Sequence, residues 1–215
     1  MKNKKIYILR HGETDYNKNG MVQGSGIDAS LNKKGQKQAD AFFNAYKEVP
    51  FDKIYITPLR RTKETVARFI DLGIPFDVLD GLREISWGNQ EGVPFTKETG
   101  TAYRRIVQMW TEGDLDLRIE GGESPIEVME RQVPAMNHIL AMKDENPVLI
   151  CTHGRAMRIL LCWLLNKSLT EMDHFGHSNC GLYVLDFDGE HFDLKTFNET
   201  GVNNGGINSQ NFLSF

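Results

Sequence analysis

Lys5-Ile6-Tyr7-Ile8-Leu9 is a short apolar stretch rich in β-branched and aromatic residues, and Arg10-His11-Gly12-Glu13-Thr14 follows it directly. The first stretch has the composition of a buried β-strand, and the second carries charged and polar groups where that strand would end. In open α/β sheets, ligands bind beyond the carboxyl ends of the strands. The junction at residues 9–11 therefore predicts a strand of a parallel sheet and one side of a binding site.

Similar short runs recur along the chain and alternate with longer segments of helical periodicity. This alternation predicts a three-layer α/β/α sandwich whose central sheet is mostly parallel, with one antiparallel strand. The last two runs flank Asp188-Gly189-Glu190-His191, which predicts an antiparallel hairpin at the end of the fold. The predicted strands after the first are Lys53–Thr57, Phe76–Leu79, Val148–Thr152, Gly181–Phe187 and Phe192–Phe197.

Three predicted helices have recognisable start signals. Asn32 is a capping residue before a helix with an apolar face, and Thr57-Pro58 places a capping hydroxyl before a proline at the first helical position. Ser124-Pro125-Ile126-Glu127 is a capping box with proline at the same place. Pro134 lies inside this third helical pattern and predicts a kink or an earlier end.

The length of 215 residues predicts a single domain, 1–215, with an inserted excursion at about 87–122. The excursion contains a predicted helix from about Thr96 to Trp110, and we interpret it as a lid over the edge of the sheet. The segment 198–211 is rich in Asn and Gly and is predicted to be irregular. Phe212, Leu213 and Phe215 are the residues that could dock this tail on the body.

Composition excludes several classes of protein. The 25 Lys and Arg against 29 Asp and Glu give a net charge of −4, which lacks the electrostatic footprint of a nucleic-acid-binding protein. No apolar run approaches the ~18 residues of a membrane span, and the run after the basic N-terminus is too short for a signal peptide. Cys151, Cys162 and Cys180 cannot all pair and lack the spacing of zinc ligands. We therefore expect a cytoplasmic protein without nucleic-acid or membrane partners.

Charged residues follow four of the predicted strands: Arg10 and His11 the first, Arg60 the second, Glu84 the third and His153 the fourth. The carboxyl ends of parallel strands meet at one edge of a sheet, so these side chains are predicted to converge on one crevice. Arginine forks suit the charged equatorial oxygens of a phosphoryl group in transfer. Either imidazole can attack phosphorus, and the glutamic acid can protonate the leaving alkoxide.

The same residues belong to a longer series of motifs. In chain order these are Arg10–Thr14 with Asn17, Gln23-Gly24, Leu31–Ala39, Thr57–Thr65, Leu82–Ile85, Gly122–Ser124 and Thr152–Gly154. This series resembles the phosphoglycerate mutase-like branch of the histidine phosphatase superfamily. The resemblance spans about Lys5 to Leu185, and such motifs in the family's order are far more specific than any one of them.

The resemblance implies that His11 is the nucleophile and carries a transient phosphohistidine. It implies that Arg10, Arg60 and His153 form the phosphate pocket and that Glu84 donates a proton and later activates water. The implied substrate-binding residues are Asn17, Gln23, Gly24 and Gly154. No metal or organic cofactor is implied, the expected partner is a small phosphorylated metabolite, and a homodimer is left open.

Some positions depart from the family's pattern or stay outside the predicted site. Gly26-Ile27-Asp28-Ala29-Ser30 stands where a Pro-Leu-Thr-like stretch is common, and Gln90 stands where an aromatic residue is frequent, which bears on substrate size. Arg61 is interpreted as a solvated start of its helix. His177 and Asn179 stay outside the predicted site, although their place just before a strand also allows a supporting role.

Hydrolysis of a phosphate monoester is the leading functional prediction, and mutase-type phosphoryl transfer is its closest rival. The chain lacks a long basic insertion after Glu84 and reads Glu13-Thr14 where mutases typically show Gln-Ser. A mutase also needs extra closing segments that keep water from the intermediate. The residues are also compatible with a non-catalytic binder of phosphorylated ligands, a protein phosphohistidine phosphatase, and a metalloenzyme built on His11, Glu13 and His153.

Overall fold

The computed structural model describes residues 3–97 and 100–200, which contain a sheet with the strand order β3-β2-β4-β1-β5-β6. The strands are β1 (Lys4–Arg10), β2 (Lys53–Ile56), β3 (Phe76–Val78), β4 (Val148–Thr152), β5 (Gly181–Phe187) and β6 (Phe192–Thr200). Strands β1 to β4 pair in parallel, and β5 runs antiparallel to both of its neighbours, β1 and β6. The predicted mostly parallel sheet with one antiparallel strand is confirmed.

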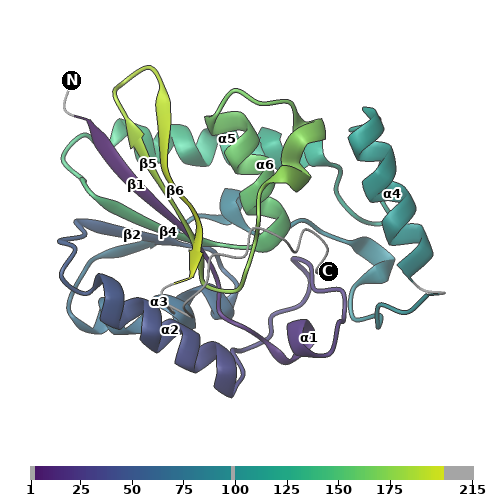
Figure 1. Ribbon diagram of the computed structural model, residues 1–215, viewed down its shortest axis with the longest axis horizontal. Coiled ribbons are helices and arrows are strands. Elements are labelled where there is room, and N and C mark those ends of the chain that lie inside the picture. Colours follow the sequence, from purple (N-terminus) through teal and green to yellow (C-terminus); the bar gives the residue numbers. More distant parts are fainter. Residues whose placement is uncertain (1–2, 98–99, 201–215) are drawn as a thin grey trace.

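Helices cover both faces of this sheet (Figure 1). Helices α2 (Lys33–Tyr46) and α3 (Arg60–Asp71) lie on one face, and α5 (Pro125–Ala141) and α6 (Gly154–Leu164) lie on the other. Helix α4 (Gly100–Glu112) stands beyond α6, at the far right of Figure 1. The remaining short elements are α1 (Asp15–Lys18) and the 3-10 helices η1 (Asp80–Leu82), η2 (Gly88–Gln90) and η3 (Leu169–His174).

Alternation along the central strands divides the core into two layers. Ile6 and Ile8 of β1 pack into the cluster that contains α5 and α6, whereas Leu9 packs with α2 and α3. All five residues of β4 are buried, as expected for a central parallel strand covered on both faces. The register pairs Arg10 with Thr152, so the carboxyl ends of β1 and β4 lie side by side. This pairing brings the residues that follow the two strands together.

Two predicted helix starts are confirmed. The side chain of Asn32 accepts the backbone N–H groups of the first turn of α2, and Ser124 forms a capping box with Glu127 at the start of α5. Helix α5 then continues through Pro134 to Ala141 without an earlier end.

The third predicted start is wrong. Helix α3 begins at Arg60, and its N-cap residue, Leu59, makes no side-chain capping bond. The hydroxyl of Thr57, predicted as the cap, accepts the N–H of Leu59 at 3.3 Å, just before the helix, and lies 2.9 Å from Nε2 of His153. Thr57 therefore helps to hold the side chain of His153, which follows the neighbouring strand β4.

The excursion at 87–122 shares the main core. Trp110 of α4 is 1% exposed and Trp87 is 5% exposed, and their ring centroids lie 5.6 Å apart. Helix α4 runs from Gly100 to Glu112, later than the predicted Thr96–Trp110. These buried indoles hold α4 against the body, where its other side chains border the site described below.

The end of the described chain is more regular than predicted. Strand β6 continues to Thr200, which pairs with Gly181, so residues 198–200 are not the irregular segment that was expected. The remainder of the predicted tail, 201–215, lies outside the described residues.

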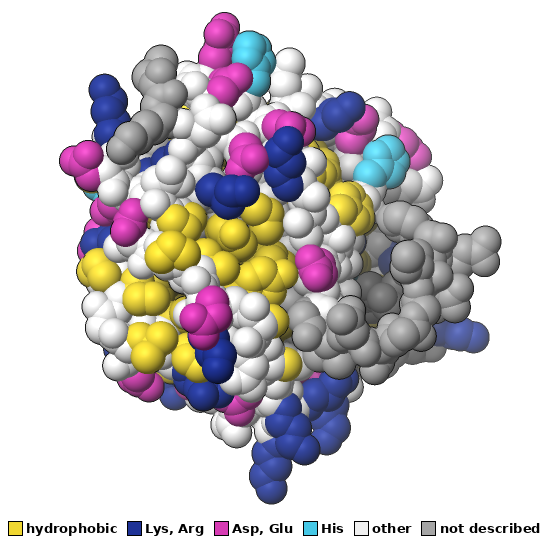
Figure 2. Space-filling model, turned by 60° about the vertical axis from the view of Figure 1, so that its left-hand side comes forward, with side chains coloured by type: hydrophobic (Ala, Val, Ile, Leu, Met, Phe, Trp, Pro, Cys, Tyr) yellow, Lys and Arg dark blue, Asp and Glu magenta, His cyan; other side chains and the backbone are white. Residues whose placement is uncertain are grey.

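Figure 2 shows hydrophobic side chains gathered on one face of the molecule with charged side chains around them. In the ranges 3–97 and 100–200, no helix combines the length and the apolar character needed to cross a bilayer.

Candidate active site

His11 follows β1 and is only 3% exposed. Its Nδ1 lies 2.7 Å from the carbonyl oxygen of Gly12. Because a carbonyl only accepts, Nδ1 carries the proton of the neutral ring and Nε2 keeps its lone pair. Burial, followed by the charges of Arg61 and Arg10, lowers the pKa of His11 well below its ordinary value. The ring is therefore neutral, with Nε2 in the form that a nucleophile requires.

The backbone beside this ring is tightly held. A Cβ on Gly12 would lie 2.7 Å from the carbonyl oxygen of Gly35, so no side chain fits where α2 approaches. The N–H of Gly12 donates to the hydroxyl of Thr65 on α3 at 3.0 Å. These two helices thereby position the carbonyl that fixes the proton of His11.

His153 caps α6 just after β4 and is fully buried. Its ring centroid lies 5.3 Å from that of His11. Nδ1 accepts a hydrogen bond from Nε of Arg61 at 3.2 Å, so Nε2 carries the ring proton and donates to Thr57 at 2.9 Å. Burial first, then the nearby Arg61, lowers the pKa of His153 well below its ordinary value. Both rings are thus held neutral beside arginine side chains.

The structure brings Arg61, and not Arg60, to the two histidines. Arg61 is fully buried and also donates to the carbonyl oxygens of Ile27 at 2.6 Å and Gly24 at 3.3 Å. The side chain of Arg60 is 57% exposed and forms an ion pair of 3.0 Å with Asp28. The expectation that Arg60 converges with the histidines is wrong. Adjacent residues of a helix point about 100° apart, so only one of the two arginines can face the sheet.

The spacing of residues along α3 could have indicated that Arg61, and not Arg60, faces the sheet. Arg61 stands four and eight residues before Thr65 and Phe69, and all three are buried on the face of α3 that packs on the sheet. Arg61, Thr65 and Phe69 thus lie along the side of α3 that faces the sheet, and Arg61 is the first of them.

The side-chain amide of Asn17 is oriented by hydrogen bonds from Thr14 and Asn179. Its Oδ1 accepts the N–H of Thr14 and Nδ2 of Asn179, each at 3.2 Å. Because both partners donate, the oxygen is occupied and the amide nitrogen of Asn17 remains as a donor. Asn179 also donates to the carbonyl oxygen of His11 at 3.1 Å. Sequence reasoning left Asn179 outside the site, and its place before β5 was the only local signal.

Arg10 and His177 lie together on another side of the site. Nη1 of Arg10 donates to the carbonyl oxygen of His177, and its buried Nε has no hydrogen-bond partner among the described residues. A Cβ on Gly154 would lie 2.8 Å from Cδ2 of His177 and 3.3 Å from Nε of Arg10, so a glycine is needed there. Nδ1 of His177 accepts from Arg158 at 3.1 Å. Burial, then Arg10 and Arg158, lowers the pKa of His177 and keeps this ring neutral too.

Glu84 is 6% exposed and lies at the start of α6. Its Oε1 accepts the N–H of Ala156 at 2.8 Å and of Ile85 at 3.0 Å, and its Oε2 accepts the N–H of Arg155 at 3.2 Å. The carboxyl group therefore lies against N–H groups of the first turn of α6 that have no partner within the helix. The predicted proton donor is therefore held beside the turn that carries His153.

A cavity of about 190 Å³ lies beside these groups; Arg10 and Gly154, the chain neighbours of His11 and His153, line it together with Glu84, whereas His11, Arg61 and His153 are not in its described lining. Its polar lining includes Arg10, Asn17, Gln23, Glu84, Gly154, His177 and Asn179, and its apolar lining includes Met21, Val22, Trp87, Phe95 and Tyr103. Nε2 of Gln23 is buried and without a hydrogen-bond partner among the described residues, while its Oε1 accepts from Thr14 at 2.7 Å. The donors of Arg10, Asn17 and Gln23 thus face a space that an anion could fill.

Gly24 has a different place from the one predicted. It does not appear in the lining of this cavity among the described residues, and its carbonyl oxygen accepts from Arg61 at 3.3 Å. A Cβ there would lie 2.8 Å from the backbone carbonyl oxygen of Ile85, so the close approach of that backbone requires glycine. Gly24 therefore supports Arg61.

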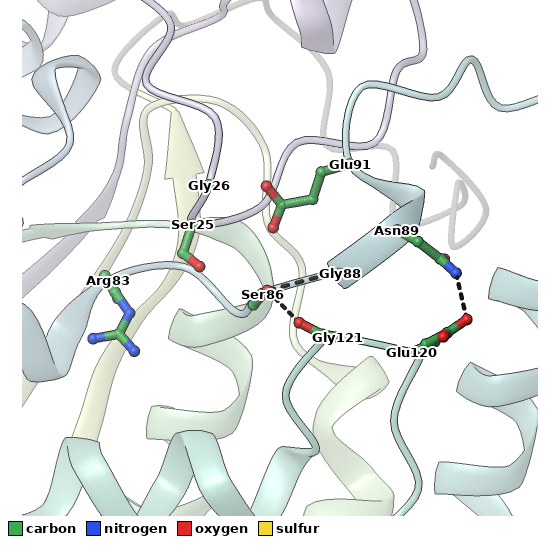
Figure 3. A pocket seen from close by; sticks show the side chains of 9 residues that line it. All are labelled: Ser25, Gly26, Arg83, Ser86, Gly88, Asn89, Glu91, Glu120 and Gly121. Carbon is green, nitrogen blue, oxygen red and sulfur yellow. Dashed lines mark hydrogen bonds between the residues drawn. The ribbon is translucent and has the colours of Figure 1, made fainter.

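A larger and more open pocket of about 630 Å³ lies beside the Gly24 loop (Figure 3). Figure 3 shows Glu91 pointing toward Ser25 and Gly26, and Asn89 bonded to Glu120 at 3.2 Å. Arg83, the cation in its described lining, is paired with Asp80 and Glu123. The arginine of this pocket is neutralised, whereas the smaller cavity holds the unpartnered donors Nε of Arg10 and Nε2 of Gln23, so the smaller cavity is the candidate site.

The residues that a metalloenzyme would use have other partners. Glu13 accepts hydrogen bonds from Lys34 at 2.7 Å and Asn32 at 3.0 Å, at the N-terminus of α2. Within the described part of the chain, no group of three or more His, Cys, Asp or Glu side chains is arranged to hold a metal ion.

Known proteins resemble this chain in sequence. The sequence model of the histidine phosphatase superfamily (branch 1) matches residues 6–200. The chain is 28% identical over 189 residues to a probable 2-carboxy-D-arabinitol-1-phosphatase of Arabidopsis thaliana, covering 86% of this chain and 38% of that protein. It is 30% identical over 186 residues to a probable phosphoglycerate mutase GpmB of Cronobacter sakazakii, covering 85% of this chain and 84% of that one.

A solved structure is similar over almost the whole fold. The mycobacterial glucosyl-3-phosphoglycerate phosphatase superposes with a TM-score of 0.78 at 25% identity, covering 92% of this chain and 99% of that one. Phosphatase and mutase names therefore both occur among the similar proteins.

Proposed function

Since the chain belongs to the histidine phosphatase superfamily, we propose that it hydrolyses a small phosphate monoester through a phosphohistidine intermediate. The observation that carries this proposal is the bond of 2.7 Å between Nδ1 of His11 and the carbonyl oxygen of Gly12. It leaves Nε2 as a neutral nucleophile in a site that holds buried arginines and a carboxyl group.

The reaction has two steps. Nε2 of His11 attacks phosphorus, the bond between phosphorus and the ester oxygen breaks, and Glu84 gives its proton to the departing alkoxide. Water then attacks the phosphohistidine, Glu84 takes a proton from that water, and the imidazole leaves as inorganic phosphate forms. Donors from Arg10, Arg61 and Asn17 stabilise the equatorial oxygens in both transition states. His153 holds Arg61 through Nδ1, and its Nε2–H donates to the hydroxyl of Thr57.

The size of the cavity supports a small substrate. Its 190 Å³ lies below the roughly 300–1,000 Å³ typical of sites for drug-sized ligands. A phosphate with a short alcohol fits such a space, and a bulky nucleotide does not. We therefore propose a small phosphorylated metabolite as the partner. We also propose a cytoplasmic location, which three free and buried cysteines support.

The experiment that tests the intermediate uses the variant His11→Ala. The wild-type protein should release inorganic phosphate from p-nitrophenyl phosphate and give an acid-labile, base-stable phosphoryl adduct after rapid denaturation. The variant should lose turnover by at least about 10³-fold and form no adduct, because no other nucleophile stands at this position. His191→Ala, at an exposed position in the turn between β5 and β6, is the matched control. An adduct that persists in His11→Ala would overturn the assignment.

Mutase-type transfer is the second candidate, favoured by the similarity to a protein named as a probable phosphoglycerate mutase. Incubation with 2- or 3-phosphoglycerate separates the two reactions. Release of free phosphate supports hydrolysis, and interconversion of the isomers without free phosphate supports the mutase.

A further inference from the structure

His177 borders the cavity and has a ring nitrogen that the proposed reaction does not use. Its Nδ1 lies 3.1 Å from Nη2 of Arg158. Because a guanidinium only donates, Nδ1 accepts this hydrogen bond, and the neutral ring carries its proton on Nε2. Within residues 3–97 and 100–200, no group forms a hydrogen bond with this Nε2. The Nε2–H of His177 is therefore a donor without a partner.

Arg158 is held in the direction that fixes this tautomer. Its Nη1 donates to Oδ1 of Asp173 at 2.7 Å, and its Nε donates to the carbonyl oxygen of Phe175 at 2.8 Å. Asp173 accepts from Arg155 on the same oxygen at 2.6 Å, so two guanidinium groups share one carboxylate. Burial, more than any other cause, lowers the pKa of Arg158 to about 10, which leaves it charged at neutral pH. Arg158 thus remains a donor to His177.

The imidazole of His177 lies along the first turn of α6. A Cβ on Gly154 would lie 2.8 Å from Cδ2, the ring carbon bonded to Nε2. Arg158, one helical turn after Gly154, holds Nδ1 at the other end of the ring. Gly154 lines the cavity, and Arg158 is not in its described lining. The ring therefore turns Nδ1 away from the cavity and the Cδ2–Nε2 edge toward it.

Arg10 opens on the same part of the cavity. Its Nε would lie 3.3 Å from the same Cβ on Gly154, and it is a buried donor without a partner among the described residues. Nη1 of Arg10 donates to the carbonyl oxygen of His177, which holds the two residues together. Two adjacent donors that the described chain leaves unsatisfied are suited to the oxygens of one anion.

We propose that His177 is a further substrate-binding residue, whose Nε2–H donates to an oxygen of the phosphoryl group that Arg10 binds. Arg158 is the positioning residue that keeps the proton on Nε2. Since Nε2 carries this proton, His177 acts as a donor and not as a base or a second nucleophile. This inference rests on the proposed phosphatase activity and adds a neutral donor to its phosphate pocket.

Two substitutions separate the two nitrogens of the ring. His177→Asn places an amide oxygen near Nδ1 that can accept from Arg158, and it has no atom at Nε2; His177→Gln places an amide N–H near Nε2. His177→Asn should lower kcat/KM for p-nitrophenyl phosphate by about 10- to 100-fold, the range of a hydrogen bond to a charged group. His177→Gln should restore most of this loss. His174→Asn, at an exposed position on η3, is the matched control and should leave kcat/KM unchanged.

The order of the two variants distinguishes substrate binding from a structural role. If the ring only holds Arg158, His177→Asn should be active and His177→Gln impaired, which would overturn the proposal; equal loss in both variants would overturn it too. The loss in His177→Asn should also be similar for p-nitrophenyl phosphate and glycerol 3-phosphate, because the donor contacts the phosphoryl group. A loss confined to one of the two esters would contradict that contact. Thermal unfolding checks that both variants are folded.

Inorganic phosphate separates this inference from the proposed function, because its binding needs no turnover. In wild-type protein labelled with ¹⁵N-histidine, NMR should show His177 as the neutral Nε2–H tautomer, assigned by the absence of its signal from either variant. Added phosphate should shift the Nε2 resonance, and a resonance that phosphate leaves unchanged would overturn the role of His177. A shift without hydrolysis of any ester would overturn the phosphatase proposal and leave the phosphate contact in place.

Discussion

Nε of Arg61 donates to Nδ1 of His153 at 3.2 Å, inside a site where both side chains are fully buried. The bond fixes the tautomer of the imidazole and the direction of the guanidinium at once. The same arginine holds the carbonyl oxygens of Gly24 and Ile27, so it also ties the loop after α1 to the ends of the strands. Burial lowers the pKa of Arg61 to about 10, which leaves it charged at neutral pH.

Replacing Arg61 should therefore remove far more activity than replacing Arg60. Arg61→Ala should lower kcat/KM for p-nitrophenyl phosphate by about 10²- to 10³-fold, the loss expected for a preorganised donor. Arg60→Ala, the matched control, removes a side chain that is 57% exposed and should change kcat/KM by less than about threefold. Equal losses in both variants would contradict the assignment. Unfolding in urea checks that Arg61→Ala is folded in the assay.

Removing the proton of Glu84 should affect esters according to their leaving groups. Glu84→Gln should slow an alkyl phosphate by about 10²- to 10⁴-fold, because its alkoxide needs a proton as it leaves. p-Nitrophenolate leaves without one, so p-nitrophenyl phosphate should slow by about tenfold or less. Glu91→Gln, at the outer pocket, is the control and should slow neither ester appreciably. Equal slowing of both esters by Glu84→Gln would remove its role as acid.

Asn179 should act through Asn17. Its Nδ2 occupies Oδ1 of Asn17 at 3.2 Å, and without it the amide of Asn17 can rotate and lose its direction. Asn179→Ala should lower kcat/KM by about tenfold, roughly one hydrogen bond. The double variant Asn17→Ala with Asn179→Ala should be little worse than Asn17→Ala alone, because the two residues act as a unit. Additive losses in this cycle would show that Asn179 acts independently.

Acid should destabilise the fold through the buried histidines. The pKa of His11 and of His153 lies well below the ordinary value in the folded state, mainly because of burial. Below about pH 6.5 the unfolded chain binds protons that the folded chain does not, so stability falls as pH falls. Each ring should remove about 1.4 kcal/mol of unfolding free energy per pH unit below pH 6.5.

Urea unfolding between pH 7.5 and 5.5 measures this effect. The carboxyl groups with a lowered pKa, such as Glu123, lose their stabilising contribution only at lower pH and leave this window clear. His11→Gln should reduce the pH slope by about one proton. An unchanged slope in that variant would contradict a neutral, buried His11.

The strands of the sheet could be predicted from the sequence because each is defined by residues that are adjacent in the chain. The predicted bounds of Val148–Thr152 and Gly181–Phe187 are those of β4 and β5, since a run of apolar residues between polar turns defines a buried strand without reference to the rest of the chain. The capping box at Ser124 and Glu127 is local in the same sense. Helix α4 was less readable: Trp110 packs against Trp87, 23 positions earlier in the chain, and such contacts set where the helix lies.

The site residues that follow strands could be predicted from the sequence, but the arginine of α3 that faces the sheet could not. Arg10, His11 and His153 follow adjacent parallel strands, whose register fixes their neighbourhood. The choice between Arg60 and Arg61 depended on where α3 begins, and that helix begins at Arg60, after an N-cap residue, Leu59, that makes no side-chain capping bond. His177 and Asn179 come to the site because antiparallel β5 lies next to β1.

The amino-acid sequence was sufficient for the layered α/β architecture, the family and the chemistry at the ends of β1 and β4, because these follow from hydrophobic periodicity and from residues adjacent in the chain. The folded structure was needed to show which arginine contacts His153, which neutral tautomer each histidine adopts and which arginines share one carboxylate. Those features arise from contacts between distant segments, such as Arg61 with His153 and Arg155 with Asp173, whose geometry no local pattern encodes.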